Sequence, residues 1–251
     1  MSQNEDQTFY AIYVKEDCLT NPTDDKYFTF SYYNGVIYED NNDHSYDITN
    51  GGWYIRCAPD IVLKGKITLP ATHKDSSGVE KPVVGIGVQA FLGITSRPTT
   101  PEEQAQGMGD NINVDGPGYG ITHVYWYGDT SNFRVIEEGA FQFAGNYTEF
   151  KYFQLPENIR RIGNNAFAYC YNLAPMDFSE THIREIGVAA FYCCFNTSGA
   201  NYPLLHFPGS LMTIEQSAFE MIFYNTSGAF GITTLQFGGQ GDPSQLSYLG
   251  I

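Results

Sequence analysis

Apolar and polar residues follow a fixed nine-residue phrase that returns five times along the chain. In each copy an apolar residue is followed three positions later by Ile, and an Ala-Phe pair ends the phrase. The copies are VVGIGVQAF (83–91), FRVIEEGAF (133–141), IRRIGNNAF (159–167), IREIGVAAF (183–191) and LMTIEQSAF (211–219). Their last residues are 50, 26, 24 and 28 positions apart. A period in the twenties predicts a solenoid, because units of this size cannot bury an apolar face alone and stack on their neighbours.

A short alternating segment lies ahead of each phrase and predicts a β-strand with one apolar face. In FQLP (153–156), for example, two apolar residues flank one that points the other way. The expected inward pairs are Ile67/Leu69, Val124/Trp126, Phe153/Leu155, Met176/Phe178, Leu205/Phe207 and Leu235/Phe237. The expected outward row is Thr68, Tyr125, Gln154, Asp177, His206 and Gln236.

Residues 95–120 interrupt the first interval between phrases. They are rich in Gly, Pro and polar residues, and without these 26 residues the 50-residue spacing becomes 24. Repeat proteins place such insertions on one face, where they often serve binding. We therefore predict an inserted loop, on which Tyr119 is a candidate contact residue.

Residues 1–60 lack the phrase and are predicted to form a β-rich N-terminal cap, while the repeat domain spans 61–251. TFYAIYV (8–14) and YFTFSYY (27–33) alternate like strands, and Asn34-Gly35 favours a type I′ turn into a hairpin. A cap in this place would cover the apolar face of the first repeat. LSYLGI (246–251) matches the opening of a further phrase, which favours an array that continues beyond residue 251.

The overall charge limits which classes of molecule the chain is expected to bind. The chain has 13 Lys+Arg against 28 Asp+Glu, a formal charge of −15 that would repel phosphate backbones and anionic lipid surfaces. No apolar run approaches the roughly 18–20 residues that cross a bilayer, and the polar MSQNEDQT at the start is not a secretory signal. We expect neither nucleic-acid binding nor membrane insertion. The expected location is extracellular or at the cell surface if a leader has been removed, and otherwise a virion.

The cysteines and the asparagines near them have structural explanations. Cys170 and Cys194 occupy a small apolar column three residues after the phrase Phe, so buried free thiols are predicted rather than disulfides or a metal site. An asparagine column two residues further on is expected to satisfy backbone groups of the turns. The Asn-X-Ser/Thr sequons at Asn146, Asn196 and Asn225 lie in or beside this column.

No catalytic or cofactor-binding constellation stands out. Asn111, Asn113 and Asp115 resemble the start of a calcium loop, but Thr122 stands where the closing bidentate Glu is needed, so no metal site is predicted. Asp177 and His206 are expected to be neighbours on adjacent strands and to form a surface ion pair rather than a catalytic dyad. We predict that the chain is not an enzyme and needs no cofactor.

The phrase and its flanking residues resemble a known repeat. FQLPENIRRIGNNAFAYCYNL (153–173) holds a strand, Leu-Pro, two spaced isoleucines, Gly, Ala-Phe, Cys and Asn-Leu in one register. This pattern is similar to the BspA-type (Treponema-type) leucine-rich repeat over about residues 61–251, although Glu137 and Glu215 replace the usual Gly. The resemblance implies an α/β-type leucine-rich-repeat solenoid, mainly β. It would be a right-handed curved stack of about 24-residue repeats with a β-hairpin N-terminal cap.

The resemblance also implies non-enzymatic, adhesin-like roles. We expect a recognition module that binds a protein or glycan on another cell or subunit, through its sheet face and the 95–120 loop. The candidate contact residues are Tyr125, Gln154, Asp177, His206, Gln236 and Tyr119. The alternative is a structural or host-recognition component of a virion, such as a phage tail or head-surface protein, built on the same repeat.

Overall fold

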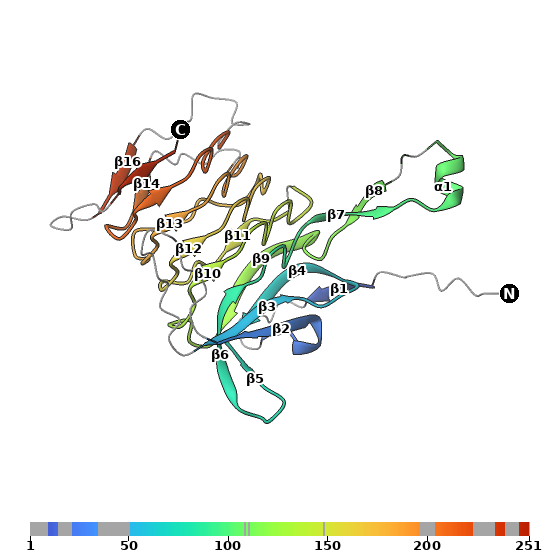
Figure 1. Cartoon of the computed structure of the whole chain (residues 1–251), viewed down its shortest axis with the longest axis horizontal. Coiled ribbons are helices and arrows are strands. Elements are labelled where there is room, and N and C mark those ends of the chain that lie inside the picture. The colour runs from blue at the N-terminus through green and yellow to red at the C-terminus, as the bar shows by residue number, and fades with distance from the viewer. Residues whose placement is uncertain are drawn as a thin grey trace.

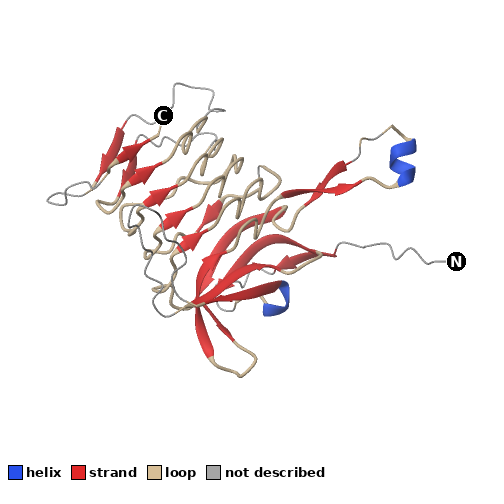
Figure 2. Ribbon diagram, in the orientation of Figure 1, coloured by secondary structure: helices blue, strands red, loops and turns tan. Residues whose placement is uncertain are grey.

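β-Strands make up almost all the regular structure of the chain. In the computed structural model (Figure 1), the described residues are 10–14, 22–34, 51–107, 109, 111–147, 149–195, 204–222, 234–238 and 246–250. The helices among them are a short 3-10 helix, η1 (Asp25–Tyr27), and a single α-helix, α1 (Pro101–Ala105) (Figure 2). The prediction of a mainly β fold is confirmed for this part of the chain. Within it, no helix has the length and apolar character needed to span a membrane.

One mainly parallel sheet joins the phrases to the N-terminal region. Its strands pair in the order β17-β15-β13-β12-β10-β6-β3-β2, and β5 pairs with β6 beside this path. They are β17 (Tyr248–Leu249), β15 (Thr213–Ile214), β13 (Glu185–Ile186), β12 (Arg161–Ile162), β10 (Val135–Ile136), β6 (Glu80–Ile86), β5 (Thr72–Lys74), β3 (Gly52–Cys57) and β2 (Phe28–Tyr33). The phrase isoleucines are register partners in the order Ile86, Ile136, Ile162, Ile186 and Ile214. The recurring Ile is therefore the residue that aligns each phrase with the next.

A second ladder of backbone hydrogen bonds runs through the Ala-Phe ends of the phrases. The amide of Phe141 donates to Ala166 O (2.7 Å), and that of Phe167 to Ala190 O (2.8 Å). Two residues before each phrase Phe the backbone is left-handed, with φ from 52° to 60°. This holds even for Ala189, where a left-handed conformation costs about 1 kcal/mol. The surrounding ladder holds the chain in this conformation against that cost.

The phrase phenylalanines form a continuous stack of rings in the core. Ring centroids lie 5.1 Å apart for Phe91 and Phe141, 5.3 Å for Phe141 and Phe167, 5.3 Å for Phe167 and Phe191, and 5.2 Å for Phe191 and Phe219. The first four rings are fully buried, whereas Phe219, at the end of the stack, is only partly buried. The prediction that the phrases pack with their rings in one shared column is confirmed.

The segments ahead of the phrases form two smaller parallel sheets. One has the order β1-β4-β9-β11 and the other pairs β14 with β16. The strands are β1 (Tyr10–Val14), β4 (Ile61–Pro70), β9 (Gly120–Tyr127), β11 (Tyr152–Phe153), β14 (Leu204–Phe207) and β16 (Thr234–Phe237). The expected strand at 176–179 is wrong, since these residues belong to no strand. Pro175 has no amide to donate to a ladder there, and Asp177 Oδ1 instead accepts the amide of Ser179 (2.9 Å).

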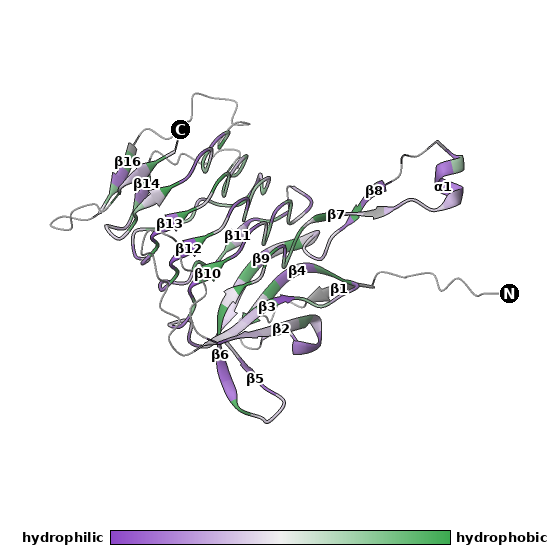
Figure 3. Cartoon of the chain, viewed as in Figure 1, coloured by the Kyte–Doolittle hydropathy of each residue, from purple (hydrophilic) through white to green (hydrophobic). Residues whose placement is uncertain are grey.

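The inward and outward assignments hold along most of these segments, and apolar and polar residues follow each other along the stacked strands (Figure 3). One assignment is wrong. Thr68, expected to face outward, is fully buried because Thr23 covers it: Thr23 N donates to Thr68 O (2.9 Å) and Thr68 N donates to Thr23 Oγ1 (3.0 Å). Leu235 lies on the same inward side as its buried register partner Leu205, but it is 47% exposed because no further repeat among the described residues covers it.

The N-terminal residues extend both ladders of the first phrase. Strands were expected at 8–14 and 27–33, and β1 and β2 are found there. β1 pairs parallel with β4, β2 pairs antiparallel with β3, and β3 pairs parallel with β6. Cys57 N also donates to Ala90 O (3.1 Å), in the position that a preceding phrase would fill. Gly35 of the expected Asn34-Gly35 turn, and the strand expected after it, lie in 35–50, outside the described residues.

The insertion after the first phrase is an antiparallel hairpin that projects from the stack (Figure 1). It consists of β7 (Ile94–Pro98), α1 and β8 (Asn111–Asp115). Thr100 caps α1, since its hydroxyl accepts the amide of Glu103 while the Glu103 carboxylate accepts the amide of Thr100. The residues weighed as a calcium loop, Asn111, Asn113 and Asp115, lie along extended β8.

The predicted buried thiols are found at Cys170 and Cys194. Both residues are fully buried, and each thiol donates to the carbonyl of a phrase Phe: Cys170 Sγ to Phe141 O (3.1 Å) and Cys194 Sγ to Phe167 O (2.9 Å). Burial raises the pKa of both thiols well above the ordinary value. The small apolar column is therefore also a column of weak hydrogen bonds between neighbouring phrases.

Of the three sequons in or beside the asparagine column, the one whose asparagine lies among the described residues is that at Asn146. Asn146 has a left-handed backbone conformation, with φ of 47°, which agrees with its expected place in a turn because asparagine tolerates this region better than most residues. The sequons at Asn196 and Asn225 lie outside the described residues.

We expect Cys170 and Cys194 to resist alkylation in the native protein and to react only on unfolding. The reactive species is the thiolate, and burial both suppresses it and blocks access to the reagent. Mass spectrometry of iodoacetamide-treated protein at pH 8, with and without denaturant, measures this directly. Rapid native labelling of either residue would contradict the packing of this column.

Candidate recognition surface

A group of aromatic side chains lies on the outward face of the β4-β9-β11 sheet. Parallel pairing sets Tyr152 of β11 beside His123 of β9, and Tyr125 projects from the same face of β9. The ring centroids of Tyr125 and Tyr152 are 5.3 Å apart, and His123 lies 6.1 Å from Tyr125 and 6.3 Å from Tyr152. Tyr152 is 41% exposed. We call His123, Tyr125 and Tyr152 the tyrosine patch.

Two lysines border the tyrosine patch and set its charge. Lys66 of β4 is the register partner of His123, and Lys151 directly precedes Tyr152. Partial burial, and then the positive charges of Lys66 and Lys151, lower the pKa of His123. The imidazole is therefore neutral at pH 7. The patch offers flat, uncharged rings beside two ammonium groups, on a chain whose formal charge is −15.

Gln154, one of the predicted contact residues, also positions a neighbour. Its side-chain Oε1 accepts the amide of Trp126 (3.0 Å), and Trp126 Nε1 donates to the Gln154 carbonyl (3.0 Å). These bonds fix the buried Trp126 ring against Phe133, with 4.7 Å between centroids. Gln154 lies next to the patch and is exposed, but its carbonyl groups are already engaged by Trp126.

The remaining predicted contact residues lie in three other places. His206 and Gln236 are register partners in the β14-β16 sheet, and His206 Nε2 lies 3.3 Å from Gly238 O. Asp177 is exposed in the segment without a strand and bonds its own turn at Ser179. Tyr119 is half-buried at the base of the hairpin insertion. The tertiary structure thus brings Tyr125 and Gln154 together, brings His206 and Gln236 together, and separates the two pairs.

The alternation that predicts Tyr125 and Gln154 also contains the patch residues that the sequence prediction omits. His123 precedes Tyr125 by two positions and Tyr152 precedes Gln154 by two, so each pair shares one face of a strand. The predicted segment 153–156 begins one residue after Tyr152, and the segment 123–126 contains His123 but assigns only Tyr125 to the outward face. Lys66 lies two residues before Thr68 in the same way.

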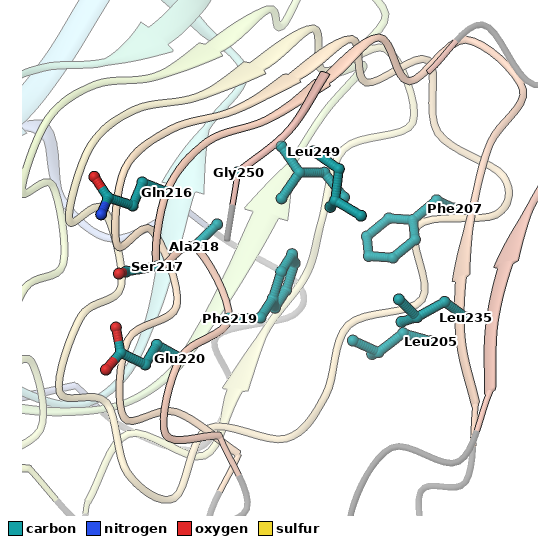
Figure 4. Close-up of a pocket in the computed structure, with 11 residues that line it drawn as sticks. Leu205, Phe207, Gln216, Ser217, Ala218, Phe219, Glu220, Leu235, Leu249 and Gly250 are labelled. Carbon is teal, nitrogen blue, oxygen red and sulfur yellow. The ribbon is translucent and has the colours of Figure 1, made fainter. Parts of the chain in front are cut away.

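An apolar cavity of about 560 Å³ lies at the last described phrase (Figure 4). Its wall is formed by Leu205, Phe207, Phe219, Leu235 and Leu249, with Gln216, Ser217 and Glu220 along one side. The ladder of the Ala-Phe ends stops here, since within the described part of the chain no acceptor faces the amides of Ser217 and Phe219. The cavity exposes the apolar face that, in each earlier phrase, is covered by the next phrase.

The repeat itself identifies the family. Residues 134–227 match the family model of the BspA type leucine rich repeat region, in six copies. Residues 134–227 are therefore a region of BspA-type leucine-rich repeats, and we call the chain BspA-like on account of this region. Repeats of this type are consistent with a binding module, and proteins that carry them are typically non-enzymatic and bind other proteins. The comparison with curated proteins gave no match.

Two solved structures are similar to this BspA-like protein over most of its length. A leucine-rich repeat protein from Bacteroides ovatus ATCC 8483 is 19% identical, with a TM-score of 0.42, over 74% of this chain and 37% of the other. The pneumococcal vaccine antigen PcpA is 21% identical, with a TM-score of 0.41, over 75% of this chain and 48% of the other. The chain therefore spans less than half the length of either protein.

One departure of this BspA-like protein from the usual repeat has a structural explanation. Glu137 stands at a Gly position, and its carboxylate accepts a hydrogen bond from the hydroxyl of buried Tyr54 (3.2 Å) and pairs with Arg161 Nη1 (3.3 Å). Arg161 Nε also pairs with Glu185 (3.1 Å) on the next strand. The carboxylate of Glu137, directly after β10, thus belongs to a polar network that links Tyr54 of β3, Arg161 of β12 and Glu185 of β13.

Proposed function

We propose that this BspA-like protein is a non-enzymatic recognition module that binds a protein or glycan through the tyrosine patch. The supporting observation is the stack of three partly exposed rings beside Lys66 and Lys151. Tyrosine offers a large contact area at a low cost in side-chain entropy, and it is enriched at binding hot spots. The lysines would favour a partner that presents acidic groups.

The architecture behind this function is a right-handed, curved solenoid of about 24-residue repeats. In it, residues 1–60 act as the N-terminal cap and residues 61–251 as the repeat domain. The aligned isoleucines and the ring column support the repeat assignment. The hairpin within 95–120 supplies a second contact region at the same end of the array, with Tyr119 at its base. A surface-exposed or extracellular location fits such a module.

We expect replacement of Tyr125 and Tyr152 together by alanine to weaken partner binding by about tenfold or more. The probe is immobilised mucin, a glycoprotein, used intact and after enzymatic removal of its glycans. Binding lost on deglycosylation identifies a glycan partner, and binding that persists identifies a protein partner. Surface plasmon resonance measures both.

The matched control replaces Tyr33 and Tyr248, two exposed tyrosines on β2 and β17, by alanine. It removes the same side chains from distant strands and should leave the affinity within about threefold of that of the unmodified protein. Equal loss in both double variants, or no loss in the Tyr125/Tyr152 variant, would remove the patch from consideration.

A further inference from the structure

Three arginines occupy the same position in successive phrases. Arg134, Arg160 and Arg184 each lie two residues before the phrase Ile. Arg160 N donates to Arg134 O (2.7 Å) and Arg184 N donates to Arg160 O (2.8 Å), so the three residues are neighbours across the sheet at about 4.8 Å intervals. They are half of the six arginines in the chain. We call them the arginine column.

Packing of the repeat does not require a cation at this position. The equivalent residues are Val84 in the first phrase and Met212 in the last, and both take part in the same ladder. Arg134 N donates to Val84 O (2.8 Å), and Met212 N donates to Arg184 O (2.8 Å). The three arginines are therefore a feature of this chain and not of the backbone geometry that the phrases share.

The turns before the strands hold two of the guanidinium groups in similar orientations. Arg134 Nη1 donates to the carbonyls of Ser131 (2.7 Å) and Phe133 (2.9 Å). Arg160 Nη1 donates to the carbonyls of Asn158 (3.0 Å) and Ile159 (3.3 Å), the two residues before it, and to His182 O (3.4 Å), just before the next phrase. A guanidinium has five donors. Because Arg160 contacts these three carbonyls through Nη1 alone, its Nε and Nη2 can donate to a ligand.

Like charges lie side by side in this column. Within the described part of the chain, neither Arg160 nor Arg184 forms an ion pair, in contrast to Arg161, which pairs with two glutamates. Burial, and then the charges of Arg134 and Arg184, lower the pKa of Arg160. Arg184 is exposed. The three adjacent cations form a local positive site on a chain whose formal charge is −15. A bound anion would offset the repulsion between the three guanidinium groups.

A polar cleft of about 350 Å³ adjoins the column and contains groups that suit sugar hydroxyls. Ser179, Ser210, His182 and His206 line it together with the carboxylates of Glu157 and Glu180. The bond from Arg160 Nη1 to His182 O connects the column to this cleft. Hydroxyl, imidazole and carboxylate groups together can accept and donate the hydrogen bonds that a sugar ring requires.

We propose that the arginine column and the adjoining cleft bind an acidic oligosaccharide that carries a carboxylate or sulfate on successive sugars. Arginine is the side chain best suited to bidentate recognition of oxyanions, because its fork of N–H donors can bond two oxygens of one group. The column spacing of about 4.8 Å is close to the length of one pyranose unit, whereas an extended peptide presents side chains on one face only every ~6.7 Å. The dense charge of a nucleic acid is disfavoured by the acidic remainder of the chain.

The test measures binding of three probes by isothermal titration calorimetry: an oligogalacturonate, a heparin-derived octasaccharide and neutral dextran. The unmodified protein should bind one or both acidic probes and not dextran. The triple variant Arg134→Gln, Arg160→Gln and Arg184→Gln should bind about tenfold or more weakly. In a plot of log affinity against log salt concentration, the magnitude of the slope for this triple variant should be smaller by roughly two to three. The reason is that binding without the three cationic contacts releases fewer counterions.

The matched control is the triple variant Lys26→Gln, Lys74→Gln and Lys81→Gln. It has the same change in net charge but lies in the N-terminal region, and its affinity should fall by less than about threefold. The single variant Arg184→Gln guards against misfolding, because that side chain is exposed. It should weaken binding without changing the melting temperature. The Tyr125/Tyr152 double variant should bind the acidic probes normally, so this site can fail or succeed independently of the tyrosine patch.

Three results would overturn the assignment. The first is equal weakening in the arginine and lysine triple variants, which would show that only net charge matters. The second is no binding of either acidic probe by the unmodified protein. The third is tighter binding of poly-glutamate or of a DNA oligonucleotide, which would show that the column prefers another class of anion.

Discussion

Replacing Phe167 by alanine is expected to lower the free energy of unfolding by about 3–5 kcal/mol. The ring is fully buried at the middle of the stack, 5.3 Å from both Phe141 and Phe191 and 5.2 Å from Phe153. Its removal loses the transfer free energy of an aromatic side chain and leaves a cavity that rigid neighbours cannot close. Urea denaturation followed by circular dichroism measures the change.

Phe219 provides the matched control for this prediction. It carries the same residue type at the same repeat position, but it ends the stack and is only partly buried. Phe219→Ala should therefore cost clearly less, about 1–2 kcal/mol, because less surface is taken from water there. A Phe167→Ala loss below about 1 kcal/mol, or equal losses at the two positions, would contradict a core built on this column.

Replacing Arg161 by methionine is expected to lower the free energy of unfolding by about 2–4 kcal/mol at pH 7. The guanidinium is only 11% exposed and lies between the carboxylates of Glu137 and Glu185, which are 18% and 20% exposed. Methionine fills much of the volume but leaves two largely buried negative charges without a cation between them. The loss comes mainly from these unpaired charges, not from the removed contacts.

The triple variant Glu137→Gln, Arg161→Met and Glu185→Gln separates these two contributions. It removes all three charges, while the amide oxygen introduced by Glu137→Gln can still accept the hydroxyl hydrogen bond of Tyr54. We expect the triple variant to regain at least half of the stability lost in Arg161→Met, measured by urea denaturation under identical conditions. A triple variant less stable than the single one would mean that the network stabilises the fold through its charges.

The two proposed binding surfaces differ in chemistry and therefore in how they would respond to salt. The tyrosine patch offers stacked rings with lysines at its border, so its binding should depend mainly on contact area. The arginine column offers fixed cations, so its binding should weaken steeply with ionic strength. The patch lies on the β4-β9-β11 sheet, whereas the column lies along the middle phrases.

The sequence by itself determined which residues form the interior. The position of Ile and Phe in each phrase decides which side chains face the core, because a repeat that stacks must place the same position at the same depth in every unit. The buried rings of Phe141 and Phe167 and the buried thiols of Cys170 and Cys194 follow from that rule. The position of Arg134, Arg160 and Arg184 seven residues before the phrase Phe is equally visible in the sequence.

Only the tertiary structure decided which outward residues share a surface. Pro175 interrupts the row between Gln154 and His206, Thr23 covers Thr68, and strand register places Tyr152 beside His123. The same holds for the charges, since Arg161 lies between two glutamates while its neighbour Arg160 pairs with no carboxylate among the described residues. Burial is a property of the repeat and recurs with it. Which side chains lie next to each other on the surface depends on strand register, on turns and on segments from outside the repeat. None of these can be read from the period of the sequence.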